Sequence, residues 1–182
     1  AGKALKKCVL ELGGTDPYIV LDTNDVKDAA KVAWEKRIDN TGQACTSNKR
    51  IIVMDDIYDE FVDEMVRIAE SYKPGDPLNP NEGEFYPLSS RDAAEKLNDQ
   101  VQRAVKEGAK LHTGGELHES AAYYSPAVLT DVPVGSESYY DEFFGPVAEI
   151  YSVSSEEEAI ELANNSNYGL GGAVFSEDKE RA

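Results

Sequence analysis

Apolar positions recur along the chain with two alternating periods, which predicts strands and helices in turn. Short apolar runs bounded by turn residues predict strands at 8–12, 18–21, 50–54, 110–113, 124–129, 147–153 and 169–175. Stretches with apolar residues every three or four positions predict helices at 25–39, 57–72, 90–108 and 155–164. Such alternation predicts an α/β fold with three α/β/α layers and a mainly parallel sheet.

The ends of several helices carry residues that commonly cap them. Ser154 or Ser155 is expected to cap the last helix, and Gly108 is expected to stop the one before it. One of the residues 22–24 is expected to cap the first helix. Residues 176–182 look like the start of a further helix, so the sequence reads as a piece of a longer chain.

The composition is that of a globular domain, and its charge excludes several classes of partner. The 182 residues include 35 acidic and 18 basic side chains, which gives a net charge of −17. A surface this acidic repels phosphate backbones and anionic lipids, so we expect no nucleic-acid partner. No apolar run is long enough to cross a bilayer and no signal peptide is recognisable, so we expect no membrane partner.

The two cysteines and two histidines stand in different contexts. Cys8 lies among apolar residues and is expected to be a buried, structural cysteine, whereas Cys45 lies in a polar loop. So few cysteines fit a reducing compartment, and we expect a cytoplasmic protein. His112 and His118 are six positions apart with no supporting ligands, so they are expected to be surface residues and no metal site is predicted.

Cys45 is a candidate nucleophile. It follows Gly42 and precedes the polar run 46–48, and a thiolate is the strongest nucleophile among ordinary side chains. The sequence around Cys45 is equally compatible with a nucleophile and with a cysteine that has no catalytic role. Lys49 and Arg50 follow closely and either stabilise a thiolate or point away from it.

Glu11 is a candidate general base. It ends the predicted strand 8–12 and precedes Gly13 and Gly14. Open parallel sheets place their sites at the carboxyl ends of strands, where a carboxylate can take a proton from water. The alternative is a strand-end carboxylate that faces solvent. No Gly-x-Gly-x-x-Gly fingerprint follows a strand, so the usual dinucleotide-binding motif is absent.

Three motifs in this order resemble the catalytic domain of the aldehyde dehydrogenases. They are Leu-Glu-Leu-Gly-Gly at 10–14 with Asp-Pro at 16–17, Asn-Thr-Gly-Gln-Ala-Cys at 40–45 with Arg50 following, and Asp-Glu-Phe-Phe-Gly-Pro-Val at 141–147. The segments 83–88 and 167–170 agree with them, and the resemblance covers the whole chain. It implies that residues 1–182 form a catalytic (thiol) domain, with the cofactor-binding domain before Ala1 and an oligomerisation strand after Ala182.

The resemblance also implies a role for each matching residue. Cys45 would attack an aldehyde carbonyl to give a thiohemiacetal and then a thioester, and its backbone N–H would supply half of an oxyanion hole. Glu11 would activate the water that hydrolyses the thioester. Glu142 would hold the nicotinamide ribose of NAD or NADP. Phe144 would contact the nicotinamide end, and Leu12 would touch the same region through its backbone.

Within the family, residues 2–7 and the Asp-Pro pair are most similar to succinate-semialdehyde dehydrogenases. This similarity implies succinate semialdehyde as substrate, Glu11-assisted hydrolysis to a free acid, and a dimeric or tetrameric full-length protein. Ser47 stands where some members carry a second, redox-active cysteine, so no redox switch is expected.

Two other functions remain open at this stage. One is a non-catalytic binding or structural protein of the same fold, and the other is an unrelated thiol hydrolase that uses Cys45. Because the cofactor-binding domain is expected to lie outside residues 1–182, we expect these residues to fold but not to oxidise aldehydes by themselves.

Overall fold

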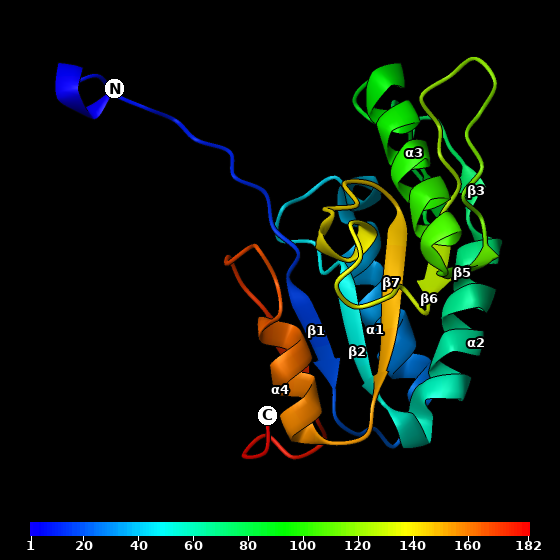
Figure 1. Ribbon diagram of the computed structural model, residues 1–182. Coiled ribbons are helices and arrows are strands. Elements are labelled where there is room, and N and C mark those ends of the chain that lie inside the picture. The colour runs from blue at the N-terminus through cyan, green and yellow to red at the C-terminus, as the bar shows by residue number, and fades with distance from the viewer.

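The computed structural model describes residues 1–182 and has a central sheet between two layers of helices (Figure 1). The six strands lie in the order β5–β6–β7–β2–β1–β8. Their bounds are β1 Pro17–Val20, β2 Arg50–Met54, β5 Lys110–Thr113, β6 Ala127–Thr130, β7 Val147–Val153 and β8 Ala173–Phe175. Only β5 and β6 pair antiparallel, and the other four pairs are parallel. The predicted, mainly parallel sheet is confirmed.

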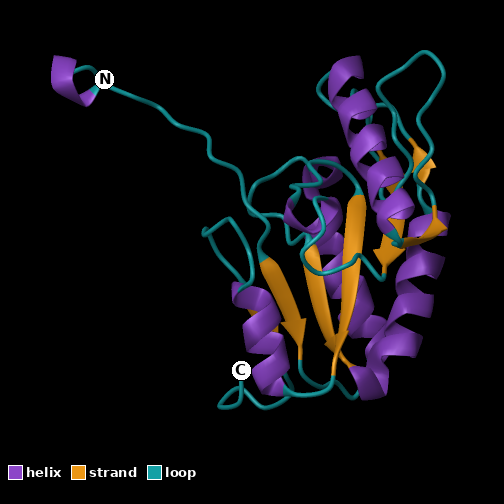
Figure 2. Cartoon of the chain, in the orientation of Figure 1, coloured by secondary structure: helices purple, strands orange, loops and turns teal.

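Four helices, α1 to α4, cover the two faces of this sheet (Figure 2). Helices α1 (Val26–Ile38) and α2 (Asp55–Ser71) share one hydrophobic core with the sheet. Helices α3 (Arg91–Glu107) and α4 (Glu156–Asn164) share the other. The three-layer prediction is therefore confirmed. Smaller elements are the parallel pair β3 (Lys73–Pro74) and β4 (Glu84–Phe85), and three 3₁₀ turns at Gly2–Ala4, Asp39–Gly42 and Ser138–Tyr140.

Successive side chains of the central strands point alternately into the two hydrophobic cores. In β2, Ile51 and Val53 face α1 and α2, whereas Ile52 faces the opposite layer, and all three are fully buried. A strand buried on both faces needs apolar residues at successive positions, which is why its sequence pattern located it correctly. None of the helices has the length and apolar character to cross a membrane.

Asp25 caps α1, so the prediction of a cap within 22–24 is wrong. Its carboxylate accepts a hydrogen bond from the Asp28 backbone N–H at 3.1 Å. Asp22 instead accepts from the backbone N–H of Glu177 at 2.7 Å and from the Ser176 hydroxyl. The caps at Ser155 and Gly108 are confirmed.

The two ends of the chain differ from the sequence predictions. Residues 8–12 form no strand but an exposed arm that leads away from the sheet (Figure 1). Cys8 is exposed rather than buried. A strand requires a partner for its backbone hydrogen bonds, and this segment pairs with none. Residues 176–182 form a turn with backbone hydrogen bonds to the Asp178 carbonyl rather than a helix.

Candidate active site

Four chain segments meet at one edge of the sheet, and each leads into a parallel strand. Residues 11–16 enter β1, 43–49 enter β2, 141–146 enter β7 and 166–172 enter β8. In Figure 1 the arrowheads of β1, β2 and β7 point away from this edge. The site therefore lies at the amino ends of the strands. The prediction that Glu11 ends a strand, at a carboxyl edge, is wrong because its two glycines precede β1 instead of following a strand.

A cavity of about 950 Å³ lies between this edge and helix α3. Glu11, Cys45, Glu142 and Phe144 all line it, so the structure brings together four of the five predicted site residues. Leu12 is the exception, because its side chain is 76% exposed and is not part of the cavity wall. Helix α3 supplies the opposite wall, which includes two cations, Lys96 and Arg103.

The loop that carries Cys45 is fixed by the completely buried side chain of Arg37. Its guanidinium donates to five acceptors in the two neighbouring segments: the carbonyl oxygens of Gly42 (3.3 Å), Phe143 (2.7 Å), Gly145 and Val147 (2.5 Å), and the hydroxyl oxygen of Ser47. Burial lowers the pKa of Arg37 to about 10, so Arg37 is still a cation at neutral pH.

Lys49 holds the same loop from the protein interior. Its ammonium donates to the carbonyl oxygens of Ala44 (2.7 Å), Cys45 (3.0 Å) and Ser47 (3.0 Å). It also lies 3.5 Å from Oε1 of Glu142, and its side chain is fully buried. Burial, followed by repulsion from the nearby guanidinium of Arg37, lowers the pKa of Lys49 to about 8, although Glu142 opposes this shift. Lys49 thus contacts the backbone of the Cys45 loop.

Arg50, by contrast, points away from the loop. It donates to the carbonyl oxygens of Thr15 at 3.0 Å, Leu162 at 2.8 Å and Ala163 at 2.9 Å. These contacts join the end of α4 to the segment before β1. Of the two cations that follow Cys45, only Lys49 therefore belongs to the site.

Glu142 joins the Glu-Leu-Gly-Gly segment to the rest of the site. Its Oε1 accepts a hydrogen bond from the backbone N–H of Gly14 at 3.0 Å. Gly13 has a φ of +76°, and a Cβ there would lie 2.5 Å from Glu142 Oε2, so a larger residue would be strained and would displace the Glu142 carboxylate. The exposed ring of Phe144 lies 5.9 Å from the Lys49 ammonium. Glu142 and Phe144 therefore stand side by side at the cavity.

The donor set of the site suits an organic cofactor and no metal. A carboxylate accepts hydrogen bonds from hydroxyl groups, and the Phe144 ring, 45% exposed, offers a flat apolar contact. No group of His, Cys, Asp and Glu side chains is arranged to hold a metal ion. His118 is exposed, and His112 is half-buried, with its Nε2 2.8 Å from the Thr130 hydroxyl.

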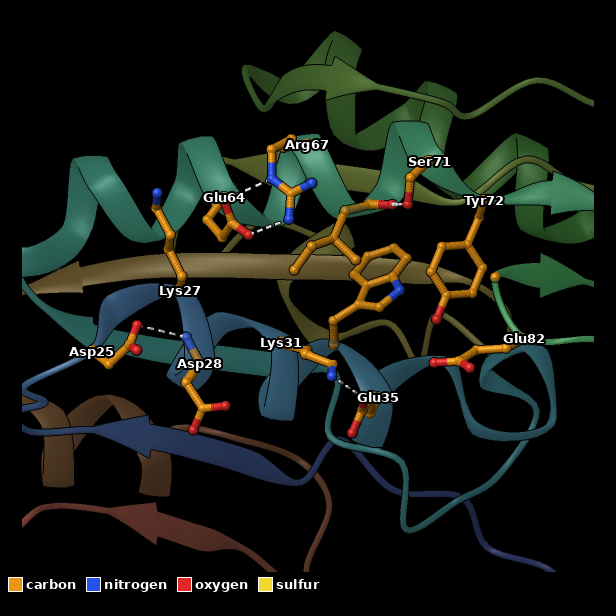
Figure 3. Close-up of a pocket in the computed structure, with 13 residues that line it drawn as sticks. Asp25, Lys27, Asp28, Lys31, Glu35, Glu64, Arg67, Ser71, Tyr72 and Glu82 are labelled. Carbon is orange, nitrogen blue, oxygen red and sulfur yellow. Dashed lines mark hydrogen bonds and ion pairs between the residues drawn. The ribbon is translucent and has the colours of Figure 1, made fainter.

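A second cavity, of about 490 Å³, lies between α1 and α2 (Figure 3). Two ion pairs lie in its wall, Lys31 with Glu35 at 3.7 Å and Arg67 with Glu64. It has no thiol and none of the five residues predicted to form the active site. The cavity beside Cys45 is therefore the candidate active site.

Sequence reasoning missed Arg37 and Tyr168. Tyr168 lines the Cys45 cavity, and its Cε1 would lie 3.0 Å from a Cβ on Gly13. A signal for Arg37 was present, because it continues the buried stripe of α1 that contains Ala30, Ala33 and Trp34. A cation on an apolar stripe indicates a buried site with several acceptors.

Comparison with known proteins shows the family to which the chain belongs. The model of a protein family described as "Aldehyde dehydrogenase family" matches residues 1–182. The chain is 51% identical to a succinate-semialdehyde dehydrogenase [NADP(+)] of Deinococcus radiodurans over 183 aligned residues, covering 100% of this chain and 38% of that protein. It is 42% identical to the succinate semialdehyde dehydrogenase [NAD(P)+] Sad of Escherichia coli K12, covering 100% of this chain and 39% of that protein.

Solved structures show the same likeness. The chain superposes on the succinic semialdehyde dehydrogenase of Streptococcus pyogenes, crystallised with NADP+, with a TM-score of 0.91 and 46% identity. That alignment covers 99% of this chain and 40% of the other. The chain therefore spans about two fifths of the length of the relatives that it matches.

Proposed function

Because the chain belongs to the aldehyde dehydrogenase family, we propose that residues 1–182 form the catalytic (thiol) domain of an NAD(P)-dependent aldehyde dehydrogenase. The observation that carries this proposal is that one cavity contains the thiol of Cys45, the carboxylate of Glu11 and the Glu142–Phe144 pair. A nucleophile, a base and a cofactor platform are the three parts that such an oxidation needs.

Cys45 is the proposed nucleophile. Its sulfur attacks the aldehyde carbonyl carbon, a C–S bond forms as the C=O π bond breaks, and the oxygen takes the proton that the thiol loses, which gives the hydroxyl of a thiohemiacetal. The backbone N–H of Cys45 donates no hydrogen bond within the protein, so it is free to stabilise the developing oxyanion. The contacts of Arg37 and Lys49 hold the loop in place during this attack.

The residues of the cavity fit the nicotinamide end of NAD or NADP. Glu142 offers a carboxylate for the ribose hydroxyls, and Phe144 and the backbone of Leu12 are proposed to contact the nicotinamide region. When bound, this cofactor supplies a hydride acceptor, which permits the thiohemiacetal to become a thioester. Glu11 then takes a proton from water, the hydroxide attacks the thioester carbonyl, and the acid leaves as the C–S bond breaks.

The proposed substrate is succinate semialdehyde. This proposal is supported by the names of two relatives, both succinate-semialdehyde dehydrogenases, which are 51% and 42% identical to this chain over its full length. We propose that the full-length protein is a cytoplasmic homo-oligomer that uses NAD or NADP. Two free cysteines and the net charge of −17 support a reducing compartment and argue against a nucleic-acid partner.

A chimera tests this proposal. The 182 residues replace the matching segment of the Escherichia coli relative, and reduction of NAD or NADP is followed with succinate semialdehyde. The chimera is expected to be active, and its Cys45→Ala variant inactive. Its Glu11→Gln variant is expected to accumulate a succinyl thioester, which peptide mass spectrometry locates on Cys45. A folded chimera whose Cys45→Ala variant keeps full activity contradicts the proposal.

The two alternative functions predict different results in simple assays. A thiol hydrolase would hydrolyse thioesters through Cys45 in the absence of any nicotinamide cofactor. A non-catalytic protein of the same fold would give a folded chimera with neither turnover nor a trapped acyl group. The structural likeness of the chain to succinic semialdehyde dehydrogenase and the presence of both Cys45 and Glu11 favour the dehydrogenase.

A further inference from the structure

We propose that Lys49 is a positioning residue that couples the carboxylate of Glu142 to the backbone of the Cys45 loop. The proposal rests on the proposed function only in taking Cys45 as the nucleophile and Glu142 as a cofactor contact. Its basis is a buried junction beneath the cavity, in which the Lys49 ammonium contacts three carbonyl oxygens of the loop and lies close to the Glu142 carboxylate.

Three carbonyl oxygens converge on the Lys49 ammonium. They belong to Ala44, Cys45 and Ser47, at 2.7, 3.0 and 3.0 Å. A lysine ammonium has three N–H donors, so the loop engages all of them. Carbonyl groups that point at one another repel unless a cation lies between them. The observed shape of the Cys45 loop therefore depends on a positive charge at this point.

Glu142 supplies the countercharge for this buried cation. Its Oε1 lies 3.5 Å from the ammonium, and the Lys49 side chain is fully buried. A second buried cation, Arg37, lies nearby and lowers the pKa of Lys49. A buried charge without a partner is strongly unfavourable. Any change at Glu142 should therefore alter how firmly Lys49 holds its three carbonyl groups.

The junction extends directly to the nucleophile. The Cys45 carbonyl fixes the peptide plane that follows the thiol-bearing residue. The same Oε1 atom of Glu142 also accepts from Gly14 N–H at 3.0 Å, so its charge is shared between Lys49 and the Glu-Leu-Gly-Gly segment. A ligand hydroxyl that engages Glu142 would compete for this charge and would change the Cys45 loop through Lys49.

A double-mutant cycle tests the coupling without substrate or cofactor. All variants carry Cys8→Ser, so that iodoacetamide reports on Cys45 alone. Alkylation rates are measured at neutral pH for the parent, Lys49→Met, Glu142→Gln and the double variant. Lys49→Met is expected to slow alkylation, because it removes a positive charge beside the loop. Glu142→Gln is expected to change the rate about 3- to 30-fold in the parent and less than about 2-fold in the Lys49→Met background.

The surface pair Lys31 and Glu35, 3.7 Å apart, provides the matched control. Lys31→Met and Glu35→Gln should leave the Cys45 rate unchanged. A purely structural role for Lys49 predicts that the effects of Lys49→Met and Glu142→Gln multiply in the double variant, and that result overturns the proposal. If Lys49→Met does not fold, Lys49→Gln, which keeps two N–H donors but no charge, replaces it in the cycle.

Glu142→Gln alone gives a further test that needs no Lys49 variant. An unchanged Cys45 alkylation rate in this variant overturns the coupling. The proposed dehydrogenase activity would be unaffected by that result, because it is judged from turnover and acyl trapping in the chimera. The two proposals therefore fail independently.

Discussion

The carbonyl oxygen of Cys45 lies 2.8 Å from the point where a Cβ atom on Gly14 would stand. Real Cβ atoms do not approach a backbone oxygen this closely, so the Glu-Leu-Gly-Gly segment and the Cys45 loop are packed directly against each other. The second glycine of the motif is thus explained by contact with the Cys45 loop.

Replacement of Gly14 by alanine should therefore displace the Cys45 loop. We expect Gly14→Ala to lower the free energy of unfolding by about 1–3 kcal/mol and to change the alkylation rate of Cys45. Urea unfolding and thiol labelling in the Cys8→Ser background measure both effects. Gly169→Ala is the matched control, since a Cβ at Gly169 meets nothing within 4 Å. Equal behaviour of the two variants would contradict the packing argument.

The two thiols should respond differently to an aldehyde. Cys8 is exposed on the amino-terminal arm, whereas Cys45 is half-buried in the cavity wall. Succinate semialdehyde in excess is expected to protect Cys45 from alkylation by forming a reversible thiohemiacetal, and to protect Cys8 much less. Peptide mass spectrometry of the wild-type chain measures both thiols in one sample, with Cys8 as internal control. Equal protection would show that the cavity does not favour this reaction.

The sequence predicted most of the sheet because burial on both faces leaves a strong pattern. Val147–Val153 and Arg50–Met54 were located at their observed bounds because their apolar residues must fill two cores. Residues 8–12 have a similar apolar pattern but no partner strand. A sequence pattern reports hydrophobicity, whereas a strand also requires backbone groups to pair with.

The location of the site at the amino ends of the strands was harder to predict. Two glycines after an apolar run suit the end of a strand as well as the approach to the next one, and the structure has the second arrangement at Gly13 and Gly14. The different roles of Lys49 and Arg50 could have been predicted from their positions in the sequence. The backbone is already extended at Lys49, whose carbonyl oxygen accepts a hydrogen bond from the Glu149 N–H at 3.1 Å. Because successive side chains of extended backbone point to opposite sides, Lys49 and Arg50 must point in opposite directions.

The carboxyl group of Glu149 should make the stability of the protein depend on pH. It is fully buried in β7, and burial raises its pKa to about 8, despite opposing effects that include Arg50 and a hydrogen bond from Tyr151. Between the ordinary pKa of 4.5 and about 8, the folded state keeps a proton that the unfolded state releases. The free energy of unfolding should therefore fall as pH rises through this window.

Glu149→Gln should remove this contribution, because an amide does not titrate. We expect the variant to lose less stability than the wild type between pH 5 and pH 8, by on the order of 3 kcal/mol at most. Urea unfolding of both proteins at the two pH values measures the difference. Glu161→Gln, which changes an exposed carboxylate of α4, should keep the pH dependence of the wild type. A Glu149→Gln variant with that same dependence would show that Glu149 ionises normally in the folded state.

Arg37→Lys should be far more damaging than its chemical similarity suggests. The guanidinium of Arg37 reaches five acceptors on two loops, whereas a lysine ammonium has only three donors at a single point. Carbonyl groups of the Cys45 loop and the 141–147 segment would then be buried without donors. We expect a loss of about 2–4 kcal/mol in the free energy of unfolding, measured with urea, and a change in Cys45 alkylation. Arg67→Lys is the control, because the Arg67 side chain is exposed and pairs only with Glu64, so its replacement should leave both measurements unchanged. If Arg37→Lys matched that control, the Cys45 loop would have to be held by Lys49 alone.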